Sequence, residues 1–216
     1  MKKERNENNA QVKIEIIGSA EFPWERAKDK VYPALAPRDW EKVEIISAAR
    51  RDFLDLAVYY YIRVMEDDCM ASIWVSEGIL NGWGVGMDAL DAQAMKNMKK
   101  VTYAKEMGEM IGAETLPYGP HILTNVDSHY GAAAMLDKES VFAFAAEKNA
   151  DLYILPSSVH EVMLQPALEE YREKINAKNL NRMVRECNRM LVTPWERLAD
   201  HIYHYSRETG EILIVE

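Results

Sequence analysis

The stretch Asp151–Ala167, DLYILPSSVHEVMLQPA, decides the fold of this chain. Two short apolar runs, Leu152–Leu155 and Val162–Leu164, flank the polar segment Pro156–Glu161. Apolar runs of this length, bounded by proline, are more typical of buried strands than of helices. The pattern therefore predicts two neighbouring strands, with the polar segment as the place where any chemistry of the protein would lie.

Further strand pairs are predicted on both sides of this stretch. Phe53–Val64, FLDLAVYYYIRV, is rich in aromatic and branched residues and predicts a central strand. Ala71–Val75, ASIWV, returns beside it as an antiparallel hairpin. The remaining predicted strand pairs are His121–Asn125 with Ala132–Leu136, and His201–Tyr205 with Ile212–Val215.

Helices are predicted where apolar residues recur every three or four positions. The predicted helices are Met87–Lys99 with a face of Leu90, Ala94 and Met98, Lys138–Lys148, and Asn179–Met190 with a stripe of Leu180, Met183, Val184, Cys187 and Leu191. Thr193–Glu196 has the pattern of a capping box with proline at the first helical position, which predicts a brief helix to Asp200.

Antiparallel strand pairs combined with separate helices predict an α+β fold, a mostly antiparallel sheet with several helices packed on it. A chain of 216 residues with 48% hydrophobic content can build a core of one domain. We predict a mobile charged tail over residues 1–11 and a single domain over residues 12–216, in which residues 12–17 form a first strand. The loop signal at residues 117–120 marks where this domain would subdivide.

The charge balance excludes several classes of protein. The chain has 26 lysine and arginine residues against 35 aspartate and glutamate residues, a net charge of −9. Nucleic acid is therefore not an expected partner, although a local basic patch is compatible with this balance.

No apolar run has the length of a signal peptide or of a membrane span, which predicts a cytoplasmic protein with no membrane partner. The two distant cysteines predict reduced thiols.

The polar segment of the opening stretch offers the residues of a hydrolase. The candidate nucleophiles are Ser157 and Ser158, the candidate bases are His160 and His129, and the orienting carboxylate is Glu161. On an extended strand Ser158 and His160 share a face while Glu161 points to the other, and the G-x-S-x-G elbow is missing. The pattern therefore favours a turn in which a serine hydroxyl bonds a nearby amide.

A second polar segment follows the strand predicted at residues 121–125. Its candidate ligand-binding residues are Asn125, Asp127, Ser128 and Tyr130, beside His129. If the strands before the two segments are neighbours, both loops converge at one end of the sheet and can bind a small polar ligand. Turn chemistry supports the alternative that this segment is only a hairpin loop.

Neither a metal site nor a cofactor is predicted. His160-Glu161 begins like a zinc-binding helix, but residue 164 is leucine where the second histidine is required. The other histidines, His121, His129, His201 and His204, lack a standard short ligand spacing, so we expect surface or locally bonded histidines.

Two features of the predicted central strand concern packing. Asp55 is a carboxylate in an apolar run and needs a partner, which Arg51 or a loop amide can supply. The aromatic run Tyr59–Tyr61 and Trp74 resemble a platform for stacking bases, but such platforms normally accompany basic grooves. We therefore expect these aromatic residues in the core or in an interface.

Several stretches together carry a resemblance to a known family. They are FLDLAVYYYIRV, ASIWVSEGILNGWGVGMDALDAQAMKN, ILTNVDSHYGAAAML, LYILPSSVHEV and the tail from Asn179 through Thr193 to Tyr205. From about Phe53 to the end, the chain resembles a bacterial family of unknown function, DUF5688. The resemblance implies neither a known activity nor a catalytic residue.

These observations lead to three hypotheses about function. The first is a non-catalytic binding or interaction protein of the bacterial cytoplasm, whose partner is a protein or a small polar ligand. The second is a hydrolase that uses Ser157 or Ser158 with His160 or His129. The third is a self-associating structural module, a homo-oligomer in which an uncovered sheet edge or the aromatic strand pairs between copies.

Overall fold

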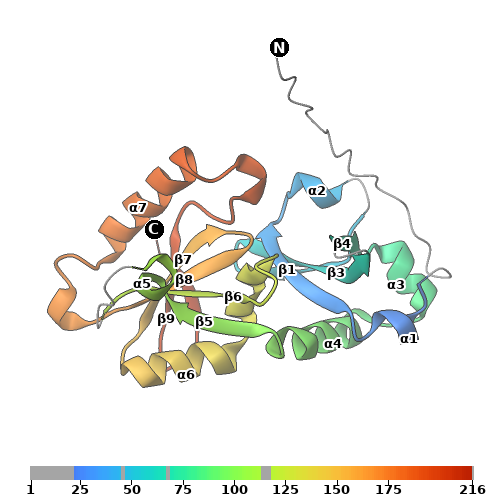
Figure 1. Ribbon diagram of the computed structural model, residues 1–216, viewed down its shortest axis with the longest axis horizontal. Helices are drawn as coiled ribbons and strands as arrows, with labels where there is room; N and C mark the ends of the chain where they lie inside the picture. The colour runs from blue at the N-terminus through green and yellow to red at the C-terminus, as the bar shows by residue number, and fades with distance from the viewer. Residues whose placement is uncertain (1–21, 45–46, 67–68, 113–117, 216) are drawn as a thin grey trace, which may run out of the picture.

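Residues 22–44, 47–66, 69–112 and 118–215 are described by the computed structural model of this chain (Figure 1). They form two antiparallel sheets with helices packed against them, which confirms the predicted α+β class. The tail predicted over residues 1–11 and the strand predicted over residues 12–17 lie outside the described residues.

The first sheet has β3 (Leu56–Glu66) at its centre, as predicted for the aromatic run. β1 (Val31–Pro37) pairs along one side of β3, while β2 (Arg50–Phe53) and then β4 (Cys69–Trp74) pair along the other. The β3–β4 hairpin is therefore confirmed. The prediction was wrong about the start of β3, because Leu54 turns the chain with a φ of 53° and its predecessor Phe53 ends β2.

Helices and aromatic side chains cover this sheet. The short helices are α1 (Trp24–Ala27), α2 (Glu41–Glu44) and α3 (Glu77–Trp83), and the longer one is α4 (Met87–Lys99). The helix α4 packs on β1 and buries its predicted face of Leu90, Ala94 and Met98. Tyr59, Tyr60 and Tyr61 of β3 are almost fully buried, which confirms the predicted role of the aromatic run in the core.

The second sheet has the strand order β10-β9-β7-β8-β6-β5. Its strands are β5 (Thr102–Glu106), β6 (His121–Asn125), β7 (Leu152–Ser158), β8 (Glu161–Pro166), β9 (Ile202–Tyr205) and β10 (Ile212–Val215). The opening stretch of the sequence forms β7 and β8, joined by a bend at Val159 and His160, as its apolar runs predict. The closing hairpin of β9 and β10 is also confirmed.

Three helices belong to the second sheet: α5 (Met107–Ile111), α6 (Lys138–Lys148) and α7 (Ala177–Met190). In Figure 1, α7 lies on one side of the sheet and α6 on the other. Leu180 and Val184 of α7 pack with Leu155 of β7 and Ile202 of β9. The predicted amphipathic packing of α7 on the sheet is therefore confirmed.

The composition of the α7 stripe differs from the prediction. Met183 and Leu191 are exposed, while two asparagines, Asn181 and Asn188, are buried in their place. The carboxamide of Asn181 accepts from the amide of Ile202 (2.9 Å) and donates to the carbonyl of Val215 (2.9 Å), so this buried polar side chain fastens the helix to the closing hairpin. Hydrophobic periodicity alone does not reveal a buried asparagine that is satisfied by distant backbone.

The strand predicted over Ala132–Leu136 is wrong. The segment is a 3-10 helix, η1 (Gly131–Leu136), buried between the two sheets against β1, β6 and β8. Its alanines have high helix propensity, and their small side chains allow the backbone to lie close to both sheets. Buried residues of the two sheets and of η1 form one continuous hydrophobic cluster.

The capping box predicted at Thr193–Glu196 is also wrong. The segment is a single 3-10 turn, η3 (Pro194–Glu196), and the Thr193 hydroxyl donates to the Glu196 carboxylate (2.6 Å) instead of accepting from an amide. A further 3-10 turn, η2 (Glu169–Tyr171), precedes α7.

Candidate functional site

The loop after β6 and the bend between β7 and β8 meet at one end of the second sheet. Because β6 pairs antiparallel with β8, as far as Leu123 opposite Val162, the end of β6 lies near the start of β8. The Thr124 hydroxyl donates to the carbonyl of His160 (2.8 Å), and the amide of Tyr130 donates to Nδ1 of His160 (3.1 Å). The two polar segments singled out in the sequence are therefore neighbours in space.

Gly131 lies at the closest approach of these segments. A Cβ atom at this position would lie 2.2 Å from the Thr124 hydroxyl, 2.6 Å from the carbonyl oxygen of His160 and 2.9 Å from the amide of Asn125. These distances are far below van der Waals contact, and two of the three atoms belong to the backbone. Only glycine fits here without displacing one segment from the other.

Asn125 holds the loop after β6 in its shape. Its side-chain oxygen accepts from the amides of Asp127 (3.1 Å) and His129 (3.2 Å), and its side-chain nitrogen donates to the carbonyl of His129 (2.8 Å). Ser128 and Tyr130 have positive φ values of 49° and 52° in this loop. Asn125 is buried, so its carboxamide supports the loop from beneath.

Each of the two candidate serine nucleophiles forms a hydrogen bond with a group other than a histidine ring. The Ser157 hydroxyl donates to the carboxylate of Glu161 (3.2 Å), and the Ser158 hydroxyl accepts from the backbone amide of His160 (3.0 Å). Both contacts are local turn contacts, as the favoured interpretation of the sequence predicts.

The ring of His160 accepts a hydrogen bond at one nitrogen and lies near a carboxylate at the other. Its Nδ1 accepts from the amide of Tyr130, so in the neutral ring the proton lies on Nε2, which is 3.7 Å from the carboxylate of Glu196. The amide of Val159 donates to the carbonyl of Glu196 (2.8 Å), and the Trp40 indole donates to the carbonyl of Trp195 (2.9 Å). The η3 turn thus brings a third segment to this end of the sheet.

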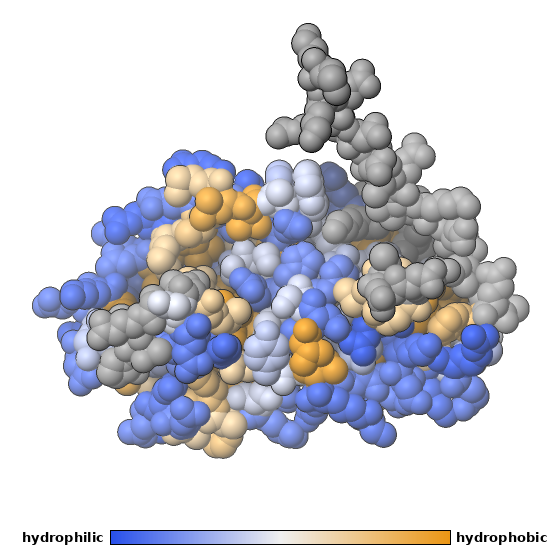
Figure 2. Space-filling model, viewed as in Figure 1, coloured by the Kyte–Doolittle hydropathy of each residue, from blue (hydrophilic) through white to orange (hydrophobic). Residues whose placement is uncertain are grey.

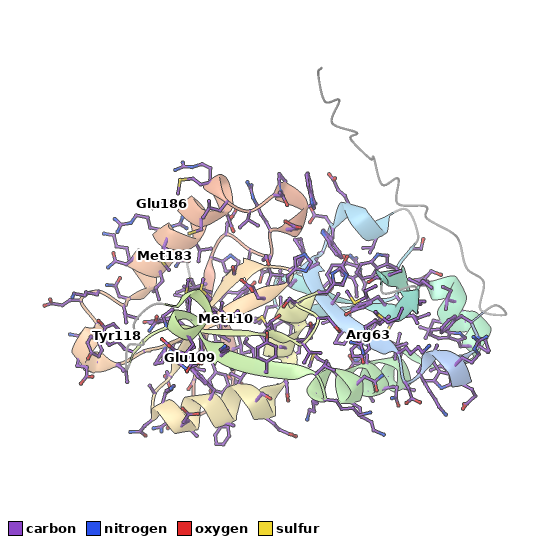
Figure 3. All side chains as sticks on the ribbon, in the orientation of Figure 1. Arg63, Glu109, Met110, Tyr118, Met183 and Glu186 are labelled. Carbon is purple, nitrogen blue, oxygen red and sulfur yellow. The ribbon has the colours of Figure 1, made fainter. Side chains whose placement is uncertain are left out.

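We call the surface formed by residues 126–130, 157–161 and 195–196 the rim. His129 connects it to the first sheet, because its Nε2 lies 3.2 Å from the hydroxyl of Ser72 on β4. Arg63 of β3 forms an ion pair with Asp127 of the loop. Figure 3 labels Arg63 on the first sheet. Both sheets therefore contribute polar side chains here.

Tyr130 points from the rim into an aromatic cluster. Its ring lies 5.1 Å from that of Trp74, 5.3 Å from that of Tyr61 and 5.7 Å from that of Trp40. Burial, with a smaller contribution from the charge of Glu196, raises the pKa of Tyr130 to about 12. Its hydroxyl therefore stays protonated near neutral pH.

Asp55 has other partners than those predicted. It lies in the turn between β2 and β3, where its carboxylate accepts from the Tyr203 hydroxyl (3.0 Å) and lies 3.4 Å from Nε2 of His201. Arg51 instead pairs with Asp88 of α4. Asp55 thus links the first sheet to β9, a contact between residues too distant in the sequence to be predicted.

The described residues include no group of three His, Cys, Asp or Glu side chains arranged to hold a metal ion. Among their histidines, the rings of His129 and His160 are neighbours, 5.4 Å apart, whereas His121 Nδ1 lies 3.1 Å from the carbonyl of Gly119 and His204 Nε2 lies 3.3 Å from the Asp151 carboxylate. Within the same residues, the helices are all too short or too polar to cross a membrane.

Sequence reasoning missed two residues of the rim, Trp195 and Glu196, and two residues that contact it, Ser72 and Arg63. All four residues lie outside the two polar segments, on β3, β4 and η3, and tertiary packing places them near these segments. The capping pattern drew attention to Glu196 for another reason, and no local signal distinguishes Ser72 or Arg63 from other polar residues on strands.

Comparison with known proteins identifies the family. Residues 2–207 match the profile of the family described as "Family of unknown function (DUF5688)", and the chain belongs to this family. The resemblance predicted from about Phe53 onward is confirmed, and the match also covers the region before it. No curated protein and no solved structure matches the chain.

Proposed function

We propose that this protein is a non-catalytic binding or interaction protein of the bacterial cytoplasm, and that the rim is its binding surface. The observation that carries the proposal is the meeting of two polar loops at Gly131, in an arrangement that assigns Ser157, Ser158 and His160 to contacts within the protein. Loops held on a rigid sheet are a common position for ligand recognition.

The polar groups of the rim favour a ligand that offers hydrogen-bond donors. Ser128 and Asp127 are exposed, and Glu161 and Glu196 are half-buried. Each of these carboxylates already has a partner within the protein: Arg63 for Asp127, Ser157 for Glu161 and Thr193 for Glu196. A carboxylate nevertheless has lone pairs for more than one hydrogen bond and attracts positive charge. A small polar molecule with amine or hydroxyl groups fits this surface better than a phosphate or a carboxylic acid does.

The test is a thermal-shift screen of small amines, amino acids and polyols, followed by rim variants. Compounds that raise the melting temperature of the wild-type protein should lose this effect in Glu161→Gln and Ser128→Ala. Glu208→Gln, an exposed carboxylate in the turn between β9 and β10, is the control and should keep the effect. Shifts that persist in both rim variants, or a panel without any shift, would contradict the proposal.

A hydrolase is the second candidate because one serine–histidine contact exists at the rim, between Ser72 and His129. A fluorophosphonate probe, which labels activated serines covalently, distinguishes the two candidates. The binding proposal predicts no labelling above that of the denatured protein. Labelling that is lost in Ser72→Ala, Ser157→Ala or Ser158→Ala would establish the hydrolase instead.

Self-association is the third candidate, and the β10 edge of the second sheet favours it. β10 is a four-residue apolar strand, ILIV, at the sheet edge, with Leu213 54% exposed and Ile214 40% exposed. The opposite edge strand, β5, carries Lys105, a residue type that protects edges from pairing. A dimer measured by light scattering that dissociates in Leu213→Lys would support this candidate, and a monomer at high concentration would remove it.

A further inference from the structure

The outer face of α7 carries a row of positive charge. Lys178, Arg182, Arg185 and Arg189 are spaced four, three and four residues apart, a spacing that places them on one face of a helix. All four are exposed. Leu180 and Val184 lie on the opposite face and are buried against the sheet. The row therefore points away from the molecule along most of the helix.

These cations stand out because the chain as a whole is acidic. The net charge is −9, yet Glu186 is the one carboxylate in the α7 sequence. Across the described part of the chain, none of the four cations of the row lies within 4.0 Å of a carboxylate, whereas Arg63, Arg51 and Lys99 each have a carboxylate partner. A row of cations without carboxylate partners among the described residues is available to a negatively charged partner.

Exposed apolar side chains lie beside and beyond the row. Met183 and Met190, two helical turns apart, are 41% and 66% exposed, and Leu191 is 79% exposed at the end of the helix. In Figure 2 the largely hydrophilic surface over α7 is interrupted by an apolar patch toward this end. Figure 3 labels Met183 and Glu186 on the same helix. The combination offers both charge and apolar area to a partner.

A shallow concavity borders the row on the Met183 side. Its volume is about 490 Å³, and it is lined by Leu180 and Met183 together with charged residues of both signs, Glu173, Lys174, Arg182 and Glu186. The two carboxylates would repel a phosphate backbone or an anionic lipid surface. A peptide places acidic and apolar side chains at separate positions, so it can meet the cations and the methionines without approaching the carboxylates.

We propose that the outer face of α7 is a docking surface for an acidic, amphipathic segment of a partner protein. Carboxylates of this segment pair with Arg182, Arg185 and Arg189, and its apolar side chains cover Met183 and Met190. Arginine suits this role because its guanidinium group binds carboxylates through two parallel hydrogen bonds. Polarizable methionine side chains adapt to different apolar partners. This surface is separate from the rim, so the proposal does not depend on the function proposed for the rim.

The experiment uses the full chain and a fluorescein-labelled synthetic peptide with the repeat Leu-Glu-Glu-Leu, measured by fluorescence anisotropy. Saturable binding is expected, and it should weaken as NaCl rises from about 0.05 M to about 0.5 M because the charges are exposed. Replacing the three arginines (Arg182→Gln, Arg185→Gln and Arg189→Gln together) should weaken binding by about tenfold, the combined effect of three exposed charge pairs. Met190→Ser should weaken binding by less.

A matched control removes the same number of charges elsewhere. Lys96→Gln, Lys100→Gln and Lys138→Gln together change exposed lysines outside α7 and should leave the affinity unchanged. Equal losses in the two triple variants would overturn the proposal, because the peptide would then sense only net charge. The proposal also fails if the peptide does not bind, or if an oligonucleotide or phosphatidylserine vesicles bind the same face more tightly than the peptide.

Discussion

The rim and the outer face of α7 are both polar surfaces, but their polar groups find partners in different places. At the rim, the ring of His160 accepts from the backbone of the neighbouring loop, while Asn125 and Ser158 bond to backbone groups of their own segments. On α7, Arg182, Arg185 and Arg189 extend into solvent. Residues whose types suggest catalysis in the sequence therefore hold the fold together, while residues that look like ordinary helix surface remain available for binding.

The largest effect on stability is expected from a substitution at Gly131, where the two polar loops approach each other most closely. Gly131→Ala should lower the free energy of unfolding by about 3 kcal/mol, because the added methyl group has no space between Thr124 and the backbone of His160. Denaturant titration measures this change. Gly78→Ala is the control, since a Cβ there would lie 3.6 Å from the Ser76 hydroxyl and the residue is exposed in α3. Equal stability of the two variants would show that the loops do not meet as described.

Replacing Asn125, the side chain that supports the loop after β6, should have the next largest effect on stability. Asn125→Ala leaves the amides of Asp127 and His129 and the carbonyl of His129 without their partner, which should destabilise the protein by about 2 kcal/mol. Asn81→Ala, at an exposed position of α3, should change the stability much less. A neutral Asn125→Ala variant would mean that the loop is shaped by something other than this side chain.

A smaller effect is expected at His121, at the other end of β6. Burial lowers the pKa of His121 below 6.5, and the ring packs 4.7 Å from that of Phe144. The unfolded chain therefore binds the proton more readily, so this contribution to stability is complete above pH 6.5 and is lost as the pH falls through the lowered pKa. In stability measurements across this range, His121→Gln should lose less stability than wild type on acidification. Parallel pH profiles for the two proteins would contradict this prediction.

The smallest effect on stability is expected from substitutions on the outer face of α7. This prediction sharpens the contrast between that face and the rim. The triple variant Arg182→Gln, Arg185→Gln and Arg189→Gln should keep its free energy of unfolding within about 0.5 kcal/mol of wild type, because exposed side chains without partners contribute little to folding. Denaturant titration beside Asn125→Ala provides the comparison. A loss as large as that of Asn125→Ala would mean that the arginines belong to the scaffold and not to a binding surface.

Local patterns predicted the elements whose contacts are close in the sequence. The aromatic and branched residues of FLDLAVYYYIRV and the two apolar runs around Pro156 identify hairpins, because each strand carries its own signal and its partner follows directly. The segment AAAML failed because five apolar residues fit a buried strand and a buried helical turn equally well. Tertiary packing between two sheets decided between them.

The two polar loops of the candidate site were predicted from local patterns, but their meeting was not. The loops at Asn125 and His160 are neighbours because β6 pairs with β8, whereas the sequence patterns predicted a pairing of residues 121–125 with residues 132–136 and left the meeting of the loops only as a condition. The contacts of His129 with Ser72 and of His160 with Glu196 join residues far apart in the chain. Such contacts depend on how the first sheet and η3 pack against the second sheet, and no spacing in the sequence encodes them.

The hydrogen bond between the amide of Tyr130 and Nδ1 of His160 tests the central claim most directly, because it joins the two loops and engages the candidate base at once. Long-range proton–nitrogen NMR spectra at mildly alkaline pH, where histidine is ordinarily neutral, report which ring nitrogen carries the proton. We predict that His160 is protonated on Nε2, with Nδ1 unprotonated and hydrogen-bonded. A proton on Nδ1 would contradict the account, since Tyr130 could not then donate to this atom and the loops would not be joined as described.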